Sequence, residues 1–418
     1  MQRFSAYSMY LFYTAIGSFC FSLMSTATVL YFIEAIHMNS FQLLMVGFVL
    51  EITVFLFEVP TGILADLYSR RLSMAIGIML TGCGFLLTSL MPSFPAILIA
   101  QVLWGIGHTF QSGADQAWIA DELASNRLDA IFLRGTQVGQ LATLAGIGAS
   151  ILFGQISLSL PIAIAGILLI LTSLFIQGWF PETGFQPETN SQVALWQRMT
   201  GTLKEGIQVI RGDALLITII LIGLFMGLYA EGFDRLWQKH LLQTFKLPAI
   251  GDGGNILWFG GLNACALLFN ILVVEWIRRH LQRTGKQTKV WILLMIHLLL
   301  TVTILVFAWT VHLGIALAAY SITFLLRQLN VPLYTAWINE SIHTSHLRAT
   351  IFSMQGQVQS LGEVLGGPLV MLVLFIWKST DVAGLITSAL LLLPICLLLL
   401  FTLRPGSKEG TIVRTKDD

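Results

Sequence analysis

The chain has 418 residues, a formal net charge of +1 and a mean hydropathy of +0.79. Only 11% of the residues are charged, whereas a typical soluble domain has about 25%, so the composition excludes an ordinary soluble enzyme. Because 23 basic residues balance 22 acidic ones without a long basic run, it also excludes a nucleic-acid-binding protein. The cysteines lie in apolar stretches without metal-ligand spacing, so we expect no metal site.

Twelve segments are long and apolar enough to cross a membrane as helices. Such a helix needs about 20 mainly apolar residues to cross about 30 Å of hydrocarbon. In chain order the predicted spans are 6–33, 41–64, 72–91, 94–117, 131–155, 158–180, 214–236, 255–276, 289–311, 313–338, 349–376 and 382–403. The first span is too long for the apolar core of a signal peptide. The sequence therefore predicts an all-α membrane protein with twelve transmembrane helices.

The basic residues orient these spans, because cytoplasmic loops carry the excess of Lys and Arg. With the N-terminus inside, 18 of the 23 basic residues fall in inner segments and four in outer segments, while Arg327 lies within a span. We therefore expect both termini in the cytoplasm.

A long inner connection with prolines and glycines divides the chain near its midpoint. It predicts an N-terminal six-helix bundle over 1–180 and a cytoplasmic central loop over 181–213. A C-terminal six-helix bundle over 214–403 and a cytoplasmic tail over 404–418 complete the predicted organisation.

The two halves also repeat each other in sequence. Ala-Trp-Ile-Ala-Asp at 117–121 recurs as Ala-Trp-Ile-Asn-Glu at 336–340, an offset of 219. After a one-residue insertion, Ile-Phe, Gln-Val, Leu and Gly within 131–146 recur within 351–366. We interpret this register as a duplication in which spans four and five correspond to spans ten and eleven.

The inner loop between spans two and three carries a recognisable motif. Residues 62–71 read Gly-Ile-Leu-Ala-Asp-Leu-Tyr-Ser-Arg-Arg. They resemble the signature Gly-x-Leu-Ala-Asp-(Arg/Lys)-x-Gly-(Arg/Lys)-(Arg/Lys) of the major facilitator superfamily, with Leu67 in place of a basic residue and Ser69 in place of glycine. The resemblance, which covers almost the whole chain, implies a secondary transporter of two six-helix bundles that works by alternating access. It also implies a bacterial cytoplasmic membrane as the location.

The resemblance assigns part of this loop to an inner latch that joins the two halves and loosens during transport. The latch residues are Gly62, Asp66, Arg70 and Arg71. Gly62 lets two helices approach closely, and Asp66 can accept from backbone N–H groups at a neighbouring helix N-terminus. The alternative is that both arginines only anchor the loop at the level of the lipid headgroups.

Two further segments, 57–62 and 112–117, are similar to the efflux-type, macrolide-exporter-like branch of this family. The sequence departs from that branch at Gln101, where exporters often carry an arginine. It also departs in span five, which has glycines but lacks the proline of the drug/proton antiporter motif. Similarity to this branch implies proton-driven export.

Carboxylates inside the predicted spans are candidates for proton coupling. Ionisable residues at membrane depth are costly and usually face a cavity or a partner, and a carboxyl desolvated there can exchange a proton near neutral pH. The candidates are Glu51 and Glu58 in span two, Asp115 in span four and Glu363 in span eleven. Structural pairing with another helix is the alternative.

Polar and aromatic residues at helical spacing predict faces that line a substrate cavity. The candidates are Tyr10, Thr14 and Ser18 in span one, Trp104, His108 and Gln111 in span four, Arg327 and Asn330 in span ten, and Gln359 in span eleven. For span one, the alternative is a small-residue packing seam between helices.

Arg327 needs a partner at membrane depth. Glu363 is the first expected partner and Glu51 a competing one; the pair either breaks during transport or is permanently structural. Glu231, Asp234 and Arg235 lie near the outer end of span seven. We interpret them as a water-exposed (wet) helix end, with an exterior gate as the alternative.

Together these patterns predict a proton-coupled exporter of lipophilic, cationic or neutral small molecules, acting as a monomer in the lipid bilayer. The excess of embedded carboxylates over cations supports that substrate charge. The alternatives are an anionic substrate or a lipid held by Arg327, or a uniporter or symporter without proton antiport. The sequence shows neither an ATP-binding loop nor the hydrolase motifs His-Glu-x-x-His and Gly-x-Ser-x-Gly. We therefore expect the proton gradient as energy source, no cofactor and no enzymatic activity.

Overall fold

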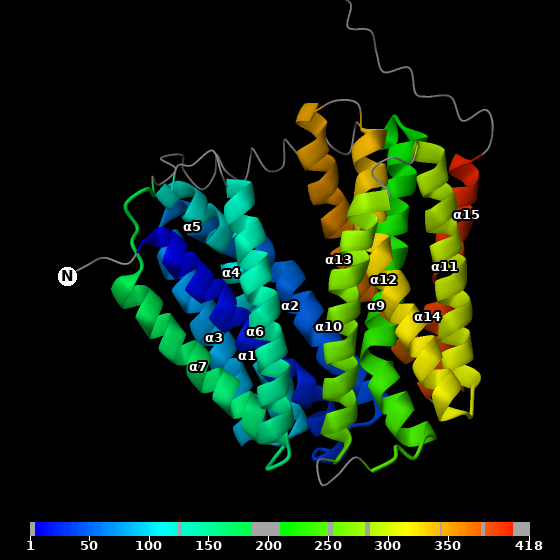
Figure 1. The fold of residues 1–418 in the computed structure, drawn as a ribbon, viewed down its shortest axis with the longest axis horizontal. Helices are drawn as coiled ribbons and strands as arrows, with labels where there is room; N and C mark the ends of the chain where they lie inside the picture. The colour runs from blue at the N-terminus through cyan, green and yellow to red at the C-terminus, as the bar shows by residue number, and fades with distance from the viewer. Residues whose placement is uncertain are drawn as a thin grey trace, which may run out of the picture. The chain divides into compact units, whose positions relative to one another are not determined.

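The computed structural model describes residues 5–123, 128–185, 210–249, 254–280, 285–342, 345–377 and 381–403. Within these ranges every regular element is a helix (Figure 1). The helices are α1 (Ala6–Glu34), α2 (Ser40–Leu67), α3 (Arg70–Leu90), α4 (Phe94–Gln111), α5 (Ala114–Leu123), α6 (Leu128–Gly154), α7 (Ser159–Trp179), α9 (Ala214–Thr244), α10 (Gly254–His280), α11 (Lys286–Trp309), α12 (Leu313–Ser341), α13 (Ser345–Trp377), α14 (Asp381–Leu390) and α15 (Leu393–Thr402). The predicted all-α fold is confirmed.

Ten segments of the described chain, with α14 and α15 taken together, are long and apolar enough to cross a membrane. The other two predicted spans correspond to α10, whose apolar part is Gly254–Phe269, and to α4 with α5. The predicted span over 94–117 is therefore wrong as one continuous helix. Gly113 has a φ of +72°, a left-handed conformation that ends α4 and that glycine adopts without a side-chain clash.

Local capping explains where several of these helices begin. Asn39 Oδ1 accepts from the Gln42 backbone N–H while Gln42 Oε1 accepts from the Asn39 backbone N–H, so α2 opens on a reciprocal capping box. Ser69 Oγ accepts from the Leu72 backbone N–H at 2.9 Å and caps α3. Ser69, which stands where the family motif has glycine, is thus the N-cap of α3.

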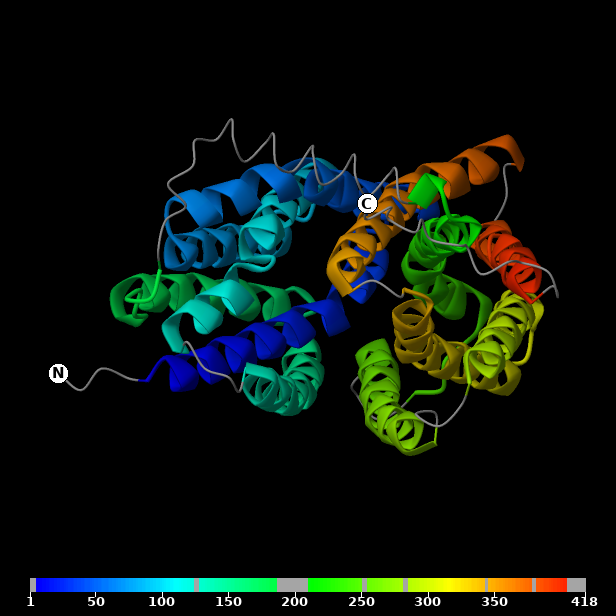
Figure 2. The same ribbon diagram turned by 90° about the horizontal axis from the view of Figure 1, so that it is seen from above.

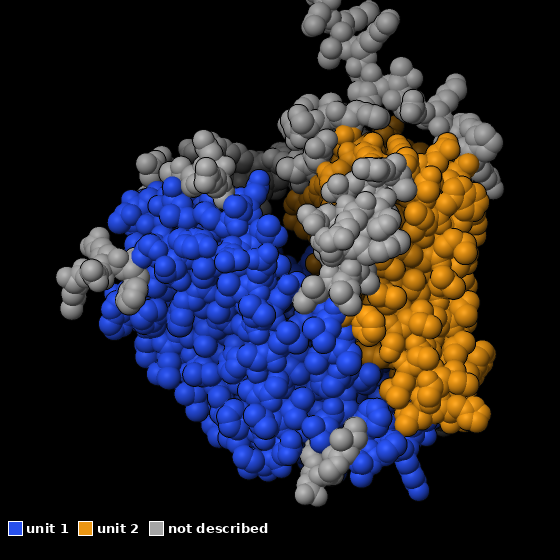
Figure 3. Space-filling view, viewed as in Figure 1, with its two compact units in different colours: residues 1–195, 235–268 blue, residues 196–234, 269–418 orange. Residues whose placement is uncertain are grey.

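Backbone positions group into two compact units, shown in blue and orange in Figure 3. Unit 1 comprises residues 1–195 and 235–268, and unit 2 comprises 196–234 and 269–418. The division falls inside α9, between Asp234 and Arg235. The bundle boundaries expected from the sequence, 1–180 and 214–403, stay a prediction.

Unit 1 is built on close packing of α1 with α6 and α7, and of α3 with α4 and α7. Its buried core includes Trp118 and Phe180, whose rings lie 4.9 Å apart. Unit 2 packs α11 against α12, α14 and α15 (yellow-green to red in Figure 2). In both units, apolar side chains pack between the helices and fix their positions. This packing determines where the polar residues of these helices lie.

Candidate functional site

The inner motif is organised around Arg70 at the start of α3. Its Nη1 lies 3.0 Å from Asp66 Oδ1 of α2, and its Nε lies 2.7 Å from Asp121 Oδ2 of α5. The contact with Asp121 is ionic without the alignment of a hydrogen bond. Arg70 therefore joins three helices of unit 1, and Asp121 is a partner that the sequence analysis did not identify.

Arg71 lies in a different contact, with the chain that follows α7. Glu182 accepts from Ser69 Oγ at 2.7 and 2.8 Å and from the Arg71 backbone N–H at 2.9 Å. The Arg71 side chain donates to Phe180 O at 3.0 Å, and Trp118 Nε1 donates to Pro181 O at 2.8 Å. We call residues 180–184 the strap, because these bonds bind it across the ends of α3 and α5.

Glu122 holds the next part of the strap. Its carboxylate accepts from the Thr183 backbone N–H and hydroxyl, at 2.5 and 2.9 Å, and from the Gly184 backbone N–H at 2.8 Å. A Cβ on Gly184 would lie 2.0 Å from the Asp121 carbonyl oxygen. The strap sequence Pro-Glu-Thr-Gly thus fits this path specifically, although from sequence alone it resembles an ordinary loop.

We expect Glu182→Ala to destabilise the purified protein by about 1–3 kcal/mol, because the Ser69 hydroxyl and the Arg71 amide lose a shared charged acceptor. Thermal unfolding in detergent measures this effect. Glu182→Gln is the matched control, since it keeps the side-chain length and one acceptor oxygen and should lose less. Equal melting temperatures for both variants and wild type would contradict the structural role of the strap.

The predicted cavity face of α1 lies against α6. A Cβ on Gly135 would lie 2.8 Å from the Tyr10 ring, and one on Gly139 would lie 3.0 Å from Ser18 Oγ and 3.4 Å from Thr14. Tyr10 is 7% exposed. The three residues thus occupy a small-residue helix contact in this structure, and their substrate role stays a prediction.

The three α4 candidates have different surroundings. Gln111 Nε2 donates to Thr81 Oγ1 at 3.1 Å and its Oε1 accepts from Tyr13 at 3.4 Å. Trp104 packs edge-to-face on Phe85, whereas the His108 side chain is exposed. Gln111 is therefore fixed by hydrogen bonds, and His108 is the accessible member of this face.

The first-half carboxylates are separated from one another along unit 1. Glu51 Oε1 lies 3.7 Å from Arg235 Nη2, and Glu58 Oε1 accepts from Ser112 Oγ at 2.7 Å. Asp115 accepts from the Gln116 backbone N–H at 2.8 Å. It lies on α5, outside the ten candidate spans, where burial raises the pKa of its carboxyl above the ordinary value.

In unit 2, Arg327 pairs with Asp234, and the expected pairing with Glu363 is wrong. Arg327 Nη1 and Nη2 donate to the two carboxylate oxygens of Asp234 at 2.5 and 2.8 Å, a bidentate geometry. The guanidinium also lies over the rings of Tyr229 and Phe233, at 5.7 and 5.5 Å from their centroids. Arg327 therefore pairs with a carboxylate of α9, because the packing of α9 and α12 brings Asp234 to it.

The predicted wet helix end around Glu231, Asp234 and Arg235 is not an end of α9. The helix continues to Thr244, and residues 236–240 are buried. Glu231 is only 5% exposed. Glu231, Asp234 and Arg235 therefore lie at interior sequence positions of α9 and are each engaged with other groups, while the Asp234 side chain stays 44% exposed.

Glu363 ends a hydrogen-bonded row of side chains on α13. Gln355 Nε2 donates to Gln359 Oε1 at 3.1 Å, and Gln359 Nε2 donates to Glu363 Oε1 at 3.3 Å. On α12, Asn330 is 2% exposed and contacts Met226 of α9 through its amide nitrogen. Its Oδ1 has no hydrogen-bond partner within the described parts of the chain.

The sequence repeat relates sites in the two units. With the offset of 219, Asp121 corresponds to Glu340, which pairs with Lys289 at the start of α11. The pair of Arg70 with Asp121 thus has a counterpart in unit 2. The same offset relates His108 to Arg327, so each repeat places a basic side chain at this position of its helix.

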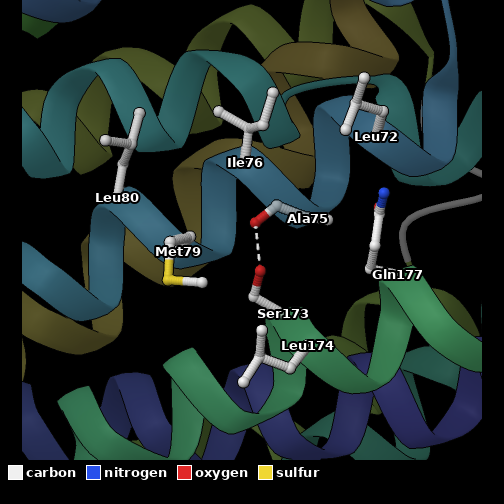
Figure 4. A pocket seen from close by; sticks show the side chains of 8 residues that line it. All are labelled: Leu72, Ala75, Ile76, Met79, Leu80, Ser173, Leu174 and Gln177. Carbon is white, nitrogen blue, oxygen red and sulfur yellow. Dashed lines mark hydrogen bonds between the residues drawn. The ribbon is translucent and has the colours of Figure 1, made fainter.

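A hollow with a volume of about 260 Å³ lies between α3 and α7 in unit 1, and Figure 4 shows the side chains that line it. Leu72, Ile76, Met79 and Leu174 line it, and Ser173 Oγ donates to the Ala75 carbonyl at 2.6 Å across its floor. None of the eight lining residues is charged, and none is a predicted site residue. The hollow therefore differs in chemistry from the polar sites described above.

Comparison with known proteins gives one result for almost the whole chain. The model of the Major Facilitator Superfamily matches residues 10–367. A protein of Bacillus subtilis (strain 168), named as the uncharacterized MFS-type transporter YxaM, is 23% identical over 406 residues, which cover 96% of this chain and 97% of that protein.

Solved structures of transporters share the fold. The nucleoside transporter NupG has a TM-score of 0.72 at 14% identity, covering 96% of this chain and 98% of its own. A peptide transporter POT in complex with sulfate also has a TM-score of 0.72 at 14% identity, covering 97% of this chain and 95% of its own. At this identity the likeness concerns the fold alone.

Proposed function

This chain belongs to the major facilitator superfamily, whose members are membrane transporters and not enzymes, and we propose that it couples the transport of a lipophilic small molecule to proton movement. It is a multi-pass secondary transporter of the cell membrane. Proton coupling requires a group inside the membrane whose protonation changes a contact between helices. The polar contacts of the two units offer such groups.

The observation that carries the proposal is the ion pair of Arg327 with Asp234. Arg327 lies near the middle of α12 and Asp234 on α9, within segments that are apolar enough to cross a membrane. A charge there is tolerated when paired, and neutralising one partner removes the attraction between the two helices. Protonation of Asp234 would therefore release α12 from α9.

Glu51 and Glu363 are further coupling candidates on other helices. Glu51 has Arg235 as a cationic neighbour at 3.7 Å, and Glu363 accepts from an amide of Gln359. In each case a proton would replace an existing polar partner. Glu58 and Asp115 bind a hydroxyl and a backbone amide respectively, so the support for their coupling role is weaker.

Two transport modes remain within this proposal. Export in exchange for protons, with a cationic or neutral substrate, is supported by the efflux-type segments 57–62 and 112–117. Cotransport of an anionic substrate with protons is the second mode, and the bidentate geometry at Arg327 favours it. An excess of embedded carboxylates is the argument for a cationic substrate. It is weakened because Glu51 already has Arg235 as a cationic neighbour.

We expect purified protein in proteoliposomes to dissipate an imposed pH gradient when a transported compound is added. The panel contains lipophilic cations, neutral macrocycles and lipophilic carboxylates. Asp234→Asn should slow proton flux at least about tenfold, a change of about 1.4 kcal/mol in the barrier, because the coupling contact is lost. Glu51→Gln tests the second candidate in the same assay.

Asp129→Asn is the matched control, because Asp129 is an exposed carboxylate at the start of α6. It should retain the proton flux of wild type. Substrate equilibration by the wild type without any proton movement would contradict proton coupling.

A further inference from the structure

The cluster around Arg327 already has the form of an anion-binding site. Its guanidinium donates both Nη groups to one carboxylate, at 2.5 and 2.8 Å. Tyr229 and Phe233, which are 4% and 2% exposed, cover the guanidinium with their rings. The rings and the fixed fork of donors orient Arg327, so it is preorganised to hold a carboxylate in this plane.

Asp234, which binds the two Nη groups of Arg327, is the more accessible of the two partners. The Asp234 side chain is 44% exposed, against 25% for Arg327. A carboxylate arriving from solution could take over both Arg327 hydrogen bonds without moving the guanidinium from the rings. An incoming cation would instead have to displace Arg327 and leave that charge without its partner, which is the costlier exchange.

We propose that the transported molecule carries a carboxylate that replaces Asp234 on Arg327, and that the displaced Asp234 takes up the coupling proton. This inference rests on the proposed function and deepens its second mode. In the exchange, the ion pair of Asp234 with Arg327 is replaced by one between the substrate carboxylate and Arg327, and one proton from solution neutralises Asp234. The net charge of the site is the same before and after, so a substrate anion and a proton load together.

The groups around Asp234 support this exchange. Arg327 and Tyr320 of α12 and Tyr229 of α9 are titratable groups close to Asp234. Glu231 and Arg235 flank it along α9, and both are engaged with other groups. Phe307 of α11 and Ser388 of α14 pack on the same part of α9, at Phe233 and Gly232, and do not titrate.

Glu363 of α13 accepts a hydrogen bond from Gln359. Arg327 is the cation shown to pair with Asp234, so a substrate that takes Arg327 removes this compensation. Protonation removes that uncompensated charge.

Binding calorimetry on the full-length protein in detergent tests this exchange. The probes are 2-naphthoate and hexanoate, each compared with its neutral amide, and 2-naphthamidine as the cationic counterpart. Measurements in phosphate and in Tris, which differ in ionisation enthalpy, give the number of protons bound with each ligand. We expect the carboxylates to bind wild type at least about tenfold more tightly than the amides, with about one proton taken up per ligand.

Variants distinguish the role of the Asp234 carboxylate from that of the ligand carboxylate that replaces it. Asp234→Asn should bind the carboxylates at least as tightly as wild type, because the internal competitor is gone, and should take up no proton. Arg327→Gln should weaken carboxylate binding at least about tenfold, and Arg327→Lys should fall between because it loses the bidentate fork. Asp129→Asn, the exposed control, should keep both the affinity and the proton uptake.

Equal binding of acid and amide, or proton uptake that persists in Asp234→Asn, would overturn this inference. Tighter binding of 2-naphthamidine than of 2-naphthoate would also overturn it, and would favour the exchange of a cation for protons. If proteoliposomes still show proton-coupled flux in those cases, the proposed function stands without this substrate class. If no compound moves protons with wild type, the proposed function itself fails.

Discussion

Replacing Gly227 by valine is expected to prevent α9 and α13 from packing in unit 2 and to abolish the yield of folded protein. A Cβ at this position would lie 2.1 Å from the Gln359 carbonyl oxygen and 2.7 Å from the Glu363 backbone nitrogen. Both atoms belong to the backbone, so no side-chain rotation relieves the clash. Overpacked cores commonly lose about 1–3 kcal/mol, and we expect a loss at the upper end of that range or beyond it.

Size-exclusion chromatography and thermal unfolding in detergent measure this effect. Gly356→Val is the matched control, because Gly356 lies on α13 and a Cβ there would meet no heavy atom within 4 Å. We expect Gly356→Val to elute as wild type does, because the open position accepts a side chain and valine has a slightly higher helix propensity than glycine. Normal elution and melting of Gly227→Val would show that the close approach of α9 and α13 is not required for folding.

The second large effect is expected for Arg70→Ala, which should lower transport at least about tenfold, or about 1.4 kcal/mol. The substitution leaves Asp66 and Asp121 side by side without the cation that joins them, so α2 and α5 repel each other at the start of α3. Arg70→Lys keeps the charge but not the fork that reaches both acids. It should retain an intermediate rate.

Arg134→Ala distinguishes a latch from a simple headgroup anchor. Arg134 is also a predicted inner arginine, and its described contact is one exposed hydrogen bond to Gln137 at 3.0 Å. Substrate uptake into proteoliposomes, normalised to reconstituted protein, should be unchanged in Arg134→Ala. Equal losses in Arg70→Ala and Arg134→Ala would support the anchoring interpretation and contradict the latch.

The latch proposed from the family resemblance has contacts that the motif itself does not reveal. Among the described residues, Asp66 pairs with Arg70 in this structure. The partners Asp121 and Glu182 lie 50 or more positions away in the sequence, on α5 and on the strap. The motif indicated which residues matter, and the folded chain identified what they bind.

The membrane spans could be predicted closely from the sequence. Hydropathy depends on composition over about 20 residues, and this is why the expected spans 6–33 and 131–155 match α1 and α6 to within a few residues. The break at Gly113 was not predicted, because an apolar run does not show a left-handed backbone conformation. A glycine followed by the polar pair Asp115 and Gln116 was its only local signal.

The sequence by itself determined that the chain is an all-α membrane protein, that its halves repeat, and that Arg327 needs a partner. Each of these depends on residue type and spacing along the chain. Only the tertiary structure decided that the partner is Asp234 rather than Glu363. Several carboxylates could satisfy one arginine at membrane depth, and the choice among them follows from which helix faces pack together.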